Sequence, residues 1–214
     1  MPEKNAGQSL LESAYELKTP DDNEKYYDAF ASTYDTDFAD GMGWNYPAAI
    51  ATAYGKAASD KDVPIADIGC GTGLVASALK ISPDLIEGMD ISPEMLRASE
   101  EKQLYRALYK VDLTASLDAI ANDYGAVLSA GTFTHGHLGP EPLENLLSIA
   151  CAGGLFVIGV NRVHFDEKQF DPVIRGLEAR GLITDLQIIE APMYSKEGHA
   201  HSDDIALILI FRKK

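Results

Sequence analysis

The stretch "ADIGCGTGL", residues 66–74, places three glycines within five positions directly after a short apolar run. Glycine is needed where the backbone enters left-handed conformations or where another molecule approaches it closely. The apolar residues before the turn predict a buried strand, and "LVASALK" after it is compatible with a helix. Ligands bind at such strand-to-helix turns in open α/β sheets. We therefore predict that a ligand contacts this turn.

Short apolar runs recur along the chain, at residues 63–68, 85–89, 107–111, 126–128 and 155–160. Segments with helical character separate them. One such segment begins with "SPE", in which Ser92 can cap, Pro93 suits the first helical position and Glu94 faces the positive helix end, so we predict a helix from about 93 to 103. This alternation is typical of parallel βα units with helices on both faces of a sheet.

The two ends of the chain depart from this alternation. Residues 166–180 read as a helix, and the strand-like segments 183–189 and 205–211 follow it, separated by a stretch rich in Pro, Gly and charge. We expect these last two strands to form a hairpin with a long loop. Residues 22–58 read as a helical lead-in to the sheet.

Size, charge and cysteine content bound the class of protein. A chain of 214 residues fits one domain, which we expect over 1–214, with a helical lead-in and lid to about 58 and a core from about 62. The formal charge of −15 argues against a nucleic-acid or anionic membrane partner. Two cysteines, Cys70 and Cys151, make no disulfide framework or four-ligand zinc site. With no export signal or long apolar span, we expect a cytoplasmic protein.

The glycine spacing helps to choose between two cofactor classes. Dinucleotide sites use G-x-G-x-x-G, whereas Gly69, Gly71 and Gly73 form G-x-G-x-G. Asp67 stands two residues before the first glycine, where its carboxylate would oppose a pyrophosphate but suit an ammonium group. An acid at the end of the second strand, here Asp90, is expected in both classes, so a nicotinamide-dependent oxidoreductase stays open as a lesser alternative.

The stretch "IADIGCGTG" resembles the first motif of class I S-adenosylmethionine-dependent methyltransferases, and the order of segments agrees over most of the chain. The resemblance implies a doubly wound, Rossmann-like α/β fold with a seven-stranded, mostly parallel sheet, helices on both faces and an antiparallel last strand. That last strand accounts for the predicted hairpin. The segments "YYDAFASTYD", "GTFTHGHLGPEPLENLL" and "CAGGLFVIGVN" are most similar to the branch containing the Williams-Beuren syndrome region methyltransferase-like protein.

The resemblance also implies S-adenosyl-L-methionine as cofactor, S-adenosyl-L-homocysteine as product, and a role for each matching residue. The glycine turn would leave room for the methionine part, and Asp67 would hold its amino group directly or through water. Asp90 would accept both ribose hydroxyls, because a carboxylate can receive two parallel hydrogen bonds. The full set of expected cofactor-binding residues is Tyr27, Tyr34, Asp67, Gly69, Cys70, Gly71, Thr72, Gly73, Asp90, Ile91, Met95, Asp112, Leu113, Ser129, Ala130 and Gly131.

Several of these residues have a structural alternative. Asp112 and Leu113 would receive the adenine, yet Asp112 can equally cap the turn-like "DLTASL". Tyr27 and Tyr34 would close over the cofactor, yet their i, i+7 spacing also suits ordinary packing on one helix face. The glycine turn itself can be structural, without a ligand.

Five histidines lie in the loops expected at the cofactor edge: His135, His137, His164, His199 and His201. A neutral hydroxyl, a thiol or an ammonium acceptor must lose a proton on methylation, and histidine is the usual base at neutral pH. We select His135 as the candidate catalytic base because it directly follows the fourth strand. The alternatives are a divalent metal site, which we do not predict, and solvated loop residues.

The expected acceptor follows from a motif that is missing at the fourth strand and from aromatic residues of the helical lead-in. The stretch "SAGTFT" lacks the Asn or Asp followed by Pro-Pro and an aromatic that is often seen in enzymes methylating adenine or glutamine nitrogen. We expect a small organic acceptor at an O, N or S atom, with Phe38, Trp44 and Tyr46 as walls of its pocket. A protein side chain is the second choice, and a non-catalytic cofactor-binding or interaction protein with this fold is the alternative. The oligomeric state is left open.

Overall fold

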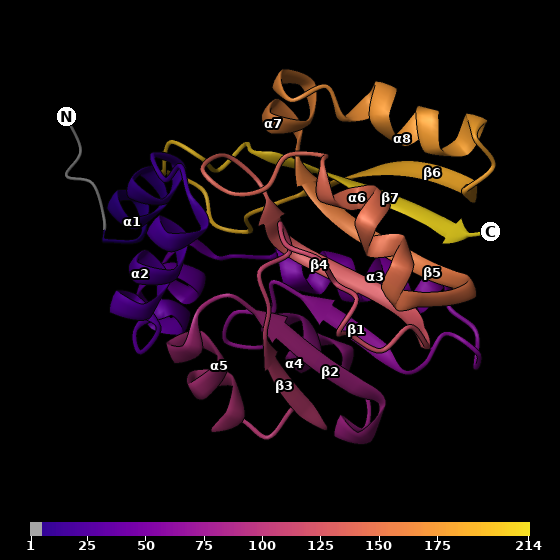
Figure 1. The fold of residues 1–214 in the computed structure, drawn as a ribbon. Coiled ribbons are helices and arrows are strands. Elements are labelled where there is room, and N and C mark those ends of the chain that lie inside the picture. The colour runs from indigo at the N-terminus through magenta and orange to yellow at the C-terminus, as the bar shows by residue number, and fades with distance from the viewer. Residues whose placement is uncertain (1–5) are drawn as a thin grey trace.

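The computed structural model describes residues 6–214 and contains one seven-stranded sheet (Figure 1). Its strand order is β3-β2-β1-β4-β5-β7-β6, and β7 is antiparallel to both of its neighbours while the other strand pairs are parallel. This arrangement confirms the predicted fold class. The strands are β1 (Ile65–Ile68), β2 (Ile86–Asp90), β3 (Ala107–Lys110), β4 (Tyr124–Phe133), β5 (Ala150–Asn161), β6 (Ile183–Pro192) and β7 (Ile205–Lys213).

Helices cover both faces of the sheet and one of its ends (Figure 1). They are α1 (Ala6–Tyr15), α2 (Pro20–Phe30), the π-helical segment η1 (Tyr34–Asp40), α3 (Tyr46–Ala57), α4 (Leu74–Leu79), α5 (Pro93–Glu100), α6 (Pro142–Leu146), α7 (Arg162–Glu167) and α8 (Phe170–Ala179), with short 3-10 turns at Pro83–Leu85 and Leu147–Ile149. None of the helices within residues 6–214 has the length and apolar character needed to cross a membrane.

The helix boundaries differ from the predicted ones where capping and backbone geometry intervene. The helix predicted from about 93 begins as expected, with the Ser92 side chain accepting from the Met95 N–H, but it ends at Glu100. The predicted helix 166–180 is two helices, because Gln169 adopts a left-handed φ of 57° between α7 and α8. The lead-in is likewise divided. Its helix α2 starts at a capping box in which Thr19 and Asp22 bond reciprocally.

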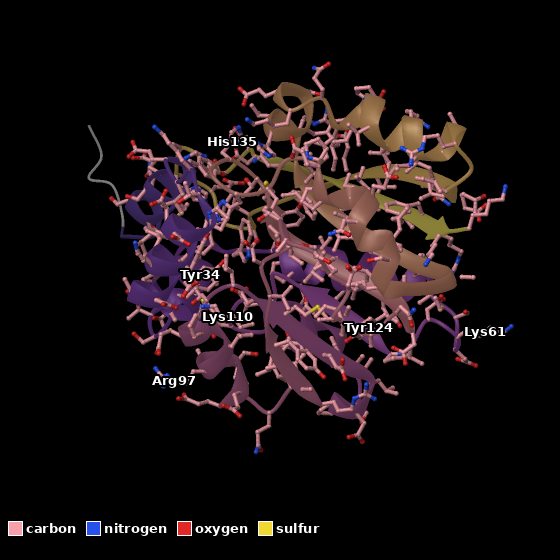
Figure 2. All side chains as sticks on the ribbon, in the orientation of Figure 1. Tyr34, Lys61, Arg97, Lys110, Tyr124 and His135 are labelled. Atoms are coloured by element: carbon pink, nitrogen blue, oxygen red, sulfur yellow. The ribbon has the colours of Figure 1, made fainter. Side chains whose placement is uncertain are left out.

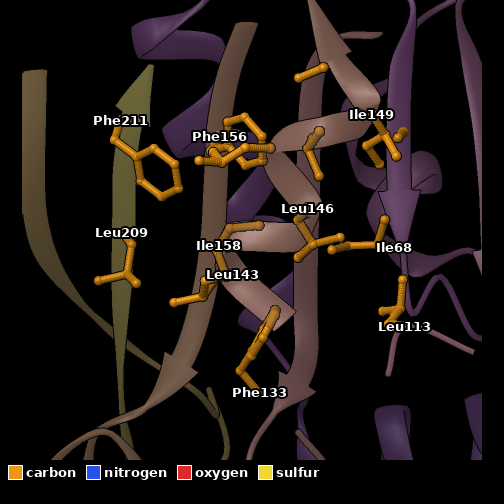
Figure 3. Close-up of a cluster of buried hydrophobic side chains, with 14 of the residues drawn as sticks. Ile68, Leu113, Phe133, Leu143, Leu146, Ile149, Phe156, Ile158, Leu209 and Phe211 are labelled. Atoms are coloured by element: carbon orange, nitrogen blue, oxygen red, sulfur yellow. The ribbon is translucent and has the colours of Figure 1, made fainter. Parts of the chain in front are cut away.

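The core forms two layers because alternate strand residues point to opposite faces of the sheet. On one face, Phe156 and Ile158 of β5 pack with side chains of α6 and α8 (Figure 3). On the other face, Leu155 and Val157 pack with side chains from α3 and α4. This second layer continues into the N-terminal helices. The lead-in is therefore attached to the sheet through the same core that supports the strands.

Candidate functional site

A cavity lies at the carboxyl ends of β1, β2, β3 and β4, with α1, α2 and η1 lining its other side. It encloses about 260 Å³ of water-accessible space. Figure 1 shows the N-terminal helices beyond the tip of β4, at the end of the sheet where ligands bind in open α/β folds. The walls are mainly aliphatic and aromatic, with a few polar groups among them. This is the composition expected of a small-molecule pocket.

The three glycines of the turn serve different purposes. Gly69 has a φ of +64°, and a Cβ there would lie 1.9 Å from Thr132 Oγ1. Gly71 also has a positive φ and lines the cavity, but a Cβ there would meet no atom within 4 Å and would point into open space. Gly73 does not line the cavity, and a Cβ there would come within 3.1 Å of Ser99 and Tyr105. Gly69 and Gly73 therefore permit close packing within the protein, Gly69 at the edge of the cavity, and Gly71 leaves open space in the cavity itself.

Asp90, the last residue of β2, lines the cavity with its carboxylate already oriented. One oxygen accepts from the Gly71 N–H at 2.8 Å and the other from the Ser92 N–H at 2.9 Å. Burial raises the pKa of Asp90, and the backbone hydrogen bonds oppose this rise. Ile91 and Met95 line the cavity beside it. Each carboxylate oxygen keeps a second lone pair, so the group can still accept hydrogen bonds from a ligand.

Asp112 and Leu113 also line the cavity. Asp112 Oδ1 accepts from both the backbone N–H and the hydroxyl of Thr114, at 2.8 and 2.7 Å. Asp112 therefore makes the capping contact within the turn that was the structural alternative to adenine binding. That contact uses only Oδ1, so Oδ2 can still accept a hydrogen bond from a ligand. The adenine-binding role of Asp112 stays a prediction.

Five of the expected cofactor residues lie outside the cavity lining: Asp67, Cys70, Thr72, Gly73 and Ser129. Ser129 donates to the Ile68 carbonyl, and Thr72 donates to Asp35. Ala130 and Gly131, which follow Ser129, do line the cavity. Cofactor roles for these five residues stay predictions, and the contacts observed for them are with other parts of the protein.

Asp67 is fully buried and accepts a hydrogen bond from the Tyr105 hydroxyl at 2.7 Å. Its other oxygen, Oδ1, has no hydrogen-bond partner in the structure. Burial raises the pKa of Asp67 to about 7; the Tyr105 hydrogen bond opposes the rise and the charge of Asp90 adds to it. Asp67 is therefore a carboxyl group that a positive charge nearby would shift toward ionisation.

The N-terminal lid contributes an aromatic wall to the cavity. Tyr27 and Tyr34 line it as predicted for residues close to the cofactor, and Phe38 and Trp44 continue the wall with ring centroids 5.2 Å apart. Tyr46, also expected in the acceptor pocket, is buried beside Trp44 but does not line the cavity. Figure 2 shows Tyr34 on the side of the cavity formed by the N-terminal helices.

Two polar contacts tie the lid to the cofactor side. Asp28 of α2 accepts from Ser92 Oγ at 2.6 Å and from the Glu94 N–H at 3.2 Å, at the start of α5. Asp35 accepts from Lys102 Nζ at 2.5 Å and from Thr72 Oγ1 at 2.5 Å. Asp35 is thus engaged with the glycine-turn segment and does not give the cavity mouth a free negative charge.

Among the histidines, His137 is the one that lines the cavity. Its Nδ1–H donates to the His135 carbonyl at 2.8 Å, so Nε2 accepts, and the Tyr27 hydroxyl donates to it at 2.7 Å. Burial lowers the pKa of His137 to about 4. His135, labelled in Figure 2, instead packs against the rings of Tyr15 and His164, and its Nε2 lies 3.2 Å from a carboxylate oxygen of Glu167.

His135 is therefore outside the cavity lining, and a role for it as base stays a prediction. Within residues 6–214, no group of three or more His, Cys, Asp or Glu side chains could hold a metal ion.

The sequence analysis did not identify three polar residues in the lid half of the cavity: Tyr15, Asn23 and Thr134. Two of them lie on α1 and α2, and although a helical lead-in was expected to about residue 58, α1 was not predicted as a separate helix. The spacing of Leu10, Leu11 and Ala14 in "SLLESAYEL" indicates an amphipathic helix and could have revealed α1. No local signal marks Asn23 or Thr134, because only the tertiary fold brings them to the cavity.

Comparisons with known proteins agree with this geometry. Residues 65–154 match the sequence model of the methyltransferase domain family. No sequence among curated proteins matches the chain.

Solved structures share the fold at low identity. The [4+2]-cyclase SpnF has a TM-score of 0.63 and 16% identity over 92% of this chain and 97% of its own. A TehB-like S-adenosylmethionine-dependent methyltransferase from Corynebacterium glutamicum has a TM-score of 0.53 and 19% identity over 92% and 100%. A Haloferax volcanii protein solved in complex with the Trm112 methyltransferase activator has a TM-score of 0.60 and 14% identity over 88% and 98%.

The cradle at Gly71 fits the methionine part of the family's cofactor, because it exposes backbone without a side chain, and Asp90 fits its ribose. Residues 65–154 thus match a methyltransferase domain, and this match together with the class I fold and the cavity supports an enzyme that uses S-adenosylmethionine as its methyl donor.

Proposed function

We propose that the enzyme methylates an O, N or S atom of a small organic molecule that binds in the same cavity as the cofactor. The observation that carries this proposal is the lid. Helices α1 and α2 and segment η1 cover the carboxyl ends of the strands and leave a largely apolar cavity beneath them. A small molecule fits such a cavity better than a protein side chain, which would need an open approach for its backbone.

The residues that line the cavity supply the cofactor contacts of this proposal. Asp90 would accept the ribose hydroxyls, Asp112 and Leu113 would receive the adenine, and Gly69, Gly71, Ala130 and Gly131 would face the methionine part. Tyr27 and Tyr34 would lie over the cofactor from the lid. The bound cofactor supplies an activated methyl group, and the chain contributes alignment of the acceptor and exclusion of water. Positioning of this kind can lower a barrier by roughly 7 to 11 kcal/mol in the best intramolecular models.

The fold by itself does not determine the reaction, since a [4+2]-cyclase shares it. The test must therefore measure methyl transfer as well as binding. Calorimetry with S-adenosylmethionine, S-adenosylhomocysteine and NAD is expected to show binding of the first two only. Incubation with methyl-labelled cofactor and a metabolite extract is then expected to label a small molecule. Binding without any labelled product would instead favour the non-catalytic alternative, and a labelled polypeptide would favour the protein-acceptor alternative.

The resemblance to the Williams-Beuren branch is a finer part of this proposal. It depends on the short motifs around Tyr27, Tyr34 and the segment that follows β4. If enzymes that share those motifs methylate a class of acceptor that other class I methyltransferases do not, that difference in acceptor would separate the branch from the others.

A further inference from the structure

The cavity extends beyond the expected cofactor residues into a region between α1, α2 and the loop after β4. We refer to this region, lined by Leu11, Tyr15, Asn23, Thr134 and Leu138, as the lid pocket. The backbone of the β4 loop approaches α1 closely here, because a Cβ on Gly136 would lie 2.1 Å from the Ala14 carbonyl oxygen. The lid pocket is thus a closely packed part of the cavity.

Asn23 presents an unused hydrogen-bond acceptor in the lid pocket. The residue is 9% exposed, and its Nδ2 donates to the Thr19 and Gly136 carbonyls, each at 3.0 Å. These two bonds determine the orientation of the amide, because a carbonyl cannot donate to Oδ1. Oδ1 is buried and has no hydrogen-bond partner among residues 6–214. Leaving such an atom unpaired is unfavourable, so the structure contains an acceptor that a ligand donor would satisfy.

Thr134 supplies a second unused polar group. It is 7% exposed, and its Oγ1 is buried without a hydrogen-bond partner, as is the hydroxyl of Tyr15. Burial raises the pKa of Tyr15 to about 12, and Thr134 is near enough to oppose the rise, although no hydrogen bond of good geometry joins the two hydroxyls. Both groups are therefore neutral and can each donate or accept.

No charged side chain of residues 6–214 is among those that line the lid pocket, although the charge of Asp204 adds to the rise of the Tyr15 pKa. Among the described residues that line the whole cavity, the charged side chains are Lys18, Asp90 and Asp112. The two acids belong to the cofactor part, and Lys18 is exposed at the edge of the lid. His137, at the border of the two parts, is kept neutral by burial, which lowers its pKa to about 4. A charged ligand group in the lid pocket would lose water and find no lining side chain of opposite charge to pair with.

We propose that the lid pocket is the acceptor subsite and that it takes an uncharged, largely apolar molecule carrying a hydroxyl group. A hydroxyl matches the unused groups because it is uncharged and can donate to Asn23 Oδ1 or accept from Thr134 Oγ1, whereas an amine or carboxylate brings a charge. This inference rests on the proposed function, because it assigns the substrate class of that same cavity.

The first test compares four probes of similar size on the full-length protein saturated with S-adenosylhomocysteine. Calorimetry is run with p-cresol, toluene, tyramine and 4-hydroxybenzoate. Toluene lacks the hydroxyl, and the other two comparison compounds add a positive or a negative charge. We expect p-cresol to bind about tenfold or more tightly than each of the others. Equal or tighter binding of toluene or of either charged compound, or no binding of p-cresol at millimolar concentration, overturns the proposal.

The second test uses Thr134→Val, which removes Oγ1 at nearly constant volume and breaks no hydrogen bond within the protein. We expect unchanged S-adenosylhomocysteine affinity and p-cresol affinity lowered about fivefold to tenfold, the effect of one hydrogen bond. Thr134→Ser should restore p-cresol binding. Thr52→Val, on α3 outside the cavity, should leave both affinities unchanged. Unaltered p-cresol affinity in Thr134→Val overturns the proposal.

These outcomes separate the subsite from the proposed function. If the probes behave as expected but no molecule of a metabolite extract gains a methyl group, the proposed function fails and the subsite assignment stands. If a labelled product forms and its acceptor is charged at neutral pH, the subsite assignment fails and the proposed function stands.

Discussion

The two halves of the cavity satisfy their polar groups in different ways. On the sheet side, Asp90 already accepts two backbone N–H groups and Asp112 accepts two donors from Thr114. On the lid side, Asn23 Oδ1 and Thr134 Oγ1 are buried without partners. The carboxylates of the sheet half are held in position by hydrogen bonds within the protein. The polar atoms of the lid half lack such bonds, and a ligand would supply them. Disturbing the first should therefore affect folding and cofactor binding, and disturbing the second should affect the acceptor.

The largest effect should come from the glycine turn, where two neighbouring substitutions separate folding from binding. Gly69→Ala combines a left-handed φ with a Cβ 1.9 Å from Thr132 Oγ1, so we expect a loss of roughly 3–5 kcal/mol in unfolding free energy. Gly71→Ala has room for its Cβ and should lose only about 1–2 kcal/mol, while its methyl group enters the cavity and weakens cofactor binding.

Urea denaturation and cofactor titration of both variants check this pair. If the Gly69→Ala variant were as stable as the Gly71→Ala variant, the close approach of Thr132 would not be the reason why a glycine is needed at position 69.

The next effect concerns the buried carboxyl group of Asp67. Its pKa of about 7 in the folded protein lies above the ordinary value, so the bound proton stabilises the folded state fully below about pH 4, and this contribution is lost as pH rises through 7. Asp67→Asn keeps a neutral acceptor for the Tyr105 hydroxyl. Its stability relative to the unmodified protein should therefore increase between pH 5 and pH 8, by about 2–3 kcal/mol.

Urea unfolding at pH 5, 6, 7 and 8 measures this difference. Parallel stability curves for the two proteins would show that Asp67 does not titrate in this range.

Asp90→Asn tests the sheet half as a binding surface. The amide has one acceptor oxygen instead of two, so either a backbone N–H or a ribose hydroxyl loses its partner. We expect S-adenosylhomocysteine to bind about 10- to 100-fold more weakly, the range for hydrogen bonds to a charged group. Asp112→Asn can keep Oδ1 for Thr114 and should lose less than about tenfold. Calorimetry on both variants decides, and unchanged affinity in Asp90→Asn would contradict the ribose assignment.

The smallest effect should come from the contact that ties the lid to the glycine-turn segment. Asp35→Asn weakens a partly exposed ion pair with Lys102, worth about 0.5–1 kcal/mol. Overall stability should change little, while hydrogen exchange in α2 and η1 should become faster. Asp37→Asn is the matched control, because Asp37 is exposed in the same segment and its side chain, within residues 6–214, accepts a hydrogen bond only from Thr36. Equal exchange rates in both variants would mean that the Asp35 contact does not hold the lid.

Much of the sheet half was predictable because its signals are local. The run 65–68, the glycine turn and Asp90 follow one another within a short span, and the parallel register brings the strand ends together at one edge. The lid half was less predictable. The fourth strand indicated that His135 would face the site, yet the loop turns His135 toward Tyr15 and places His137 at the cavity. A two-residue shift of this kind depends on loop geometry, which hydrophobic periodicity does not encode.

The sequence by itself determined the alternation of strands and helices, the antiparallel ending and the ligand turn, since each depends on spacing and residue type within one segment. Only the tertiary structure decided which histidine reaches the cavity, that Gly73 serves packing, and that Asn23 bonds the distant Gly136 and lines the same cavity as Thr134. The physical reason is that burial and hydrogen-bond partners are properties of three-dimensional neighbours, and those neighbours come from segments that are distant in the sequence.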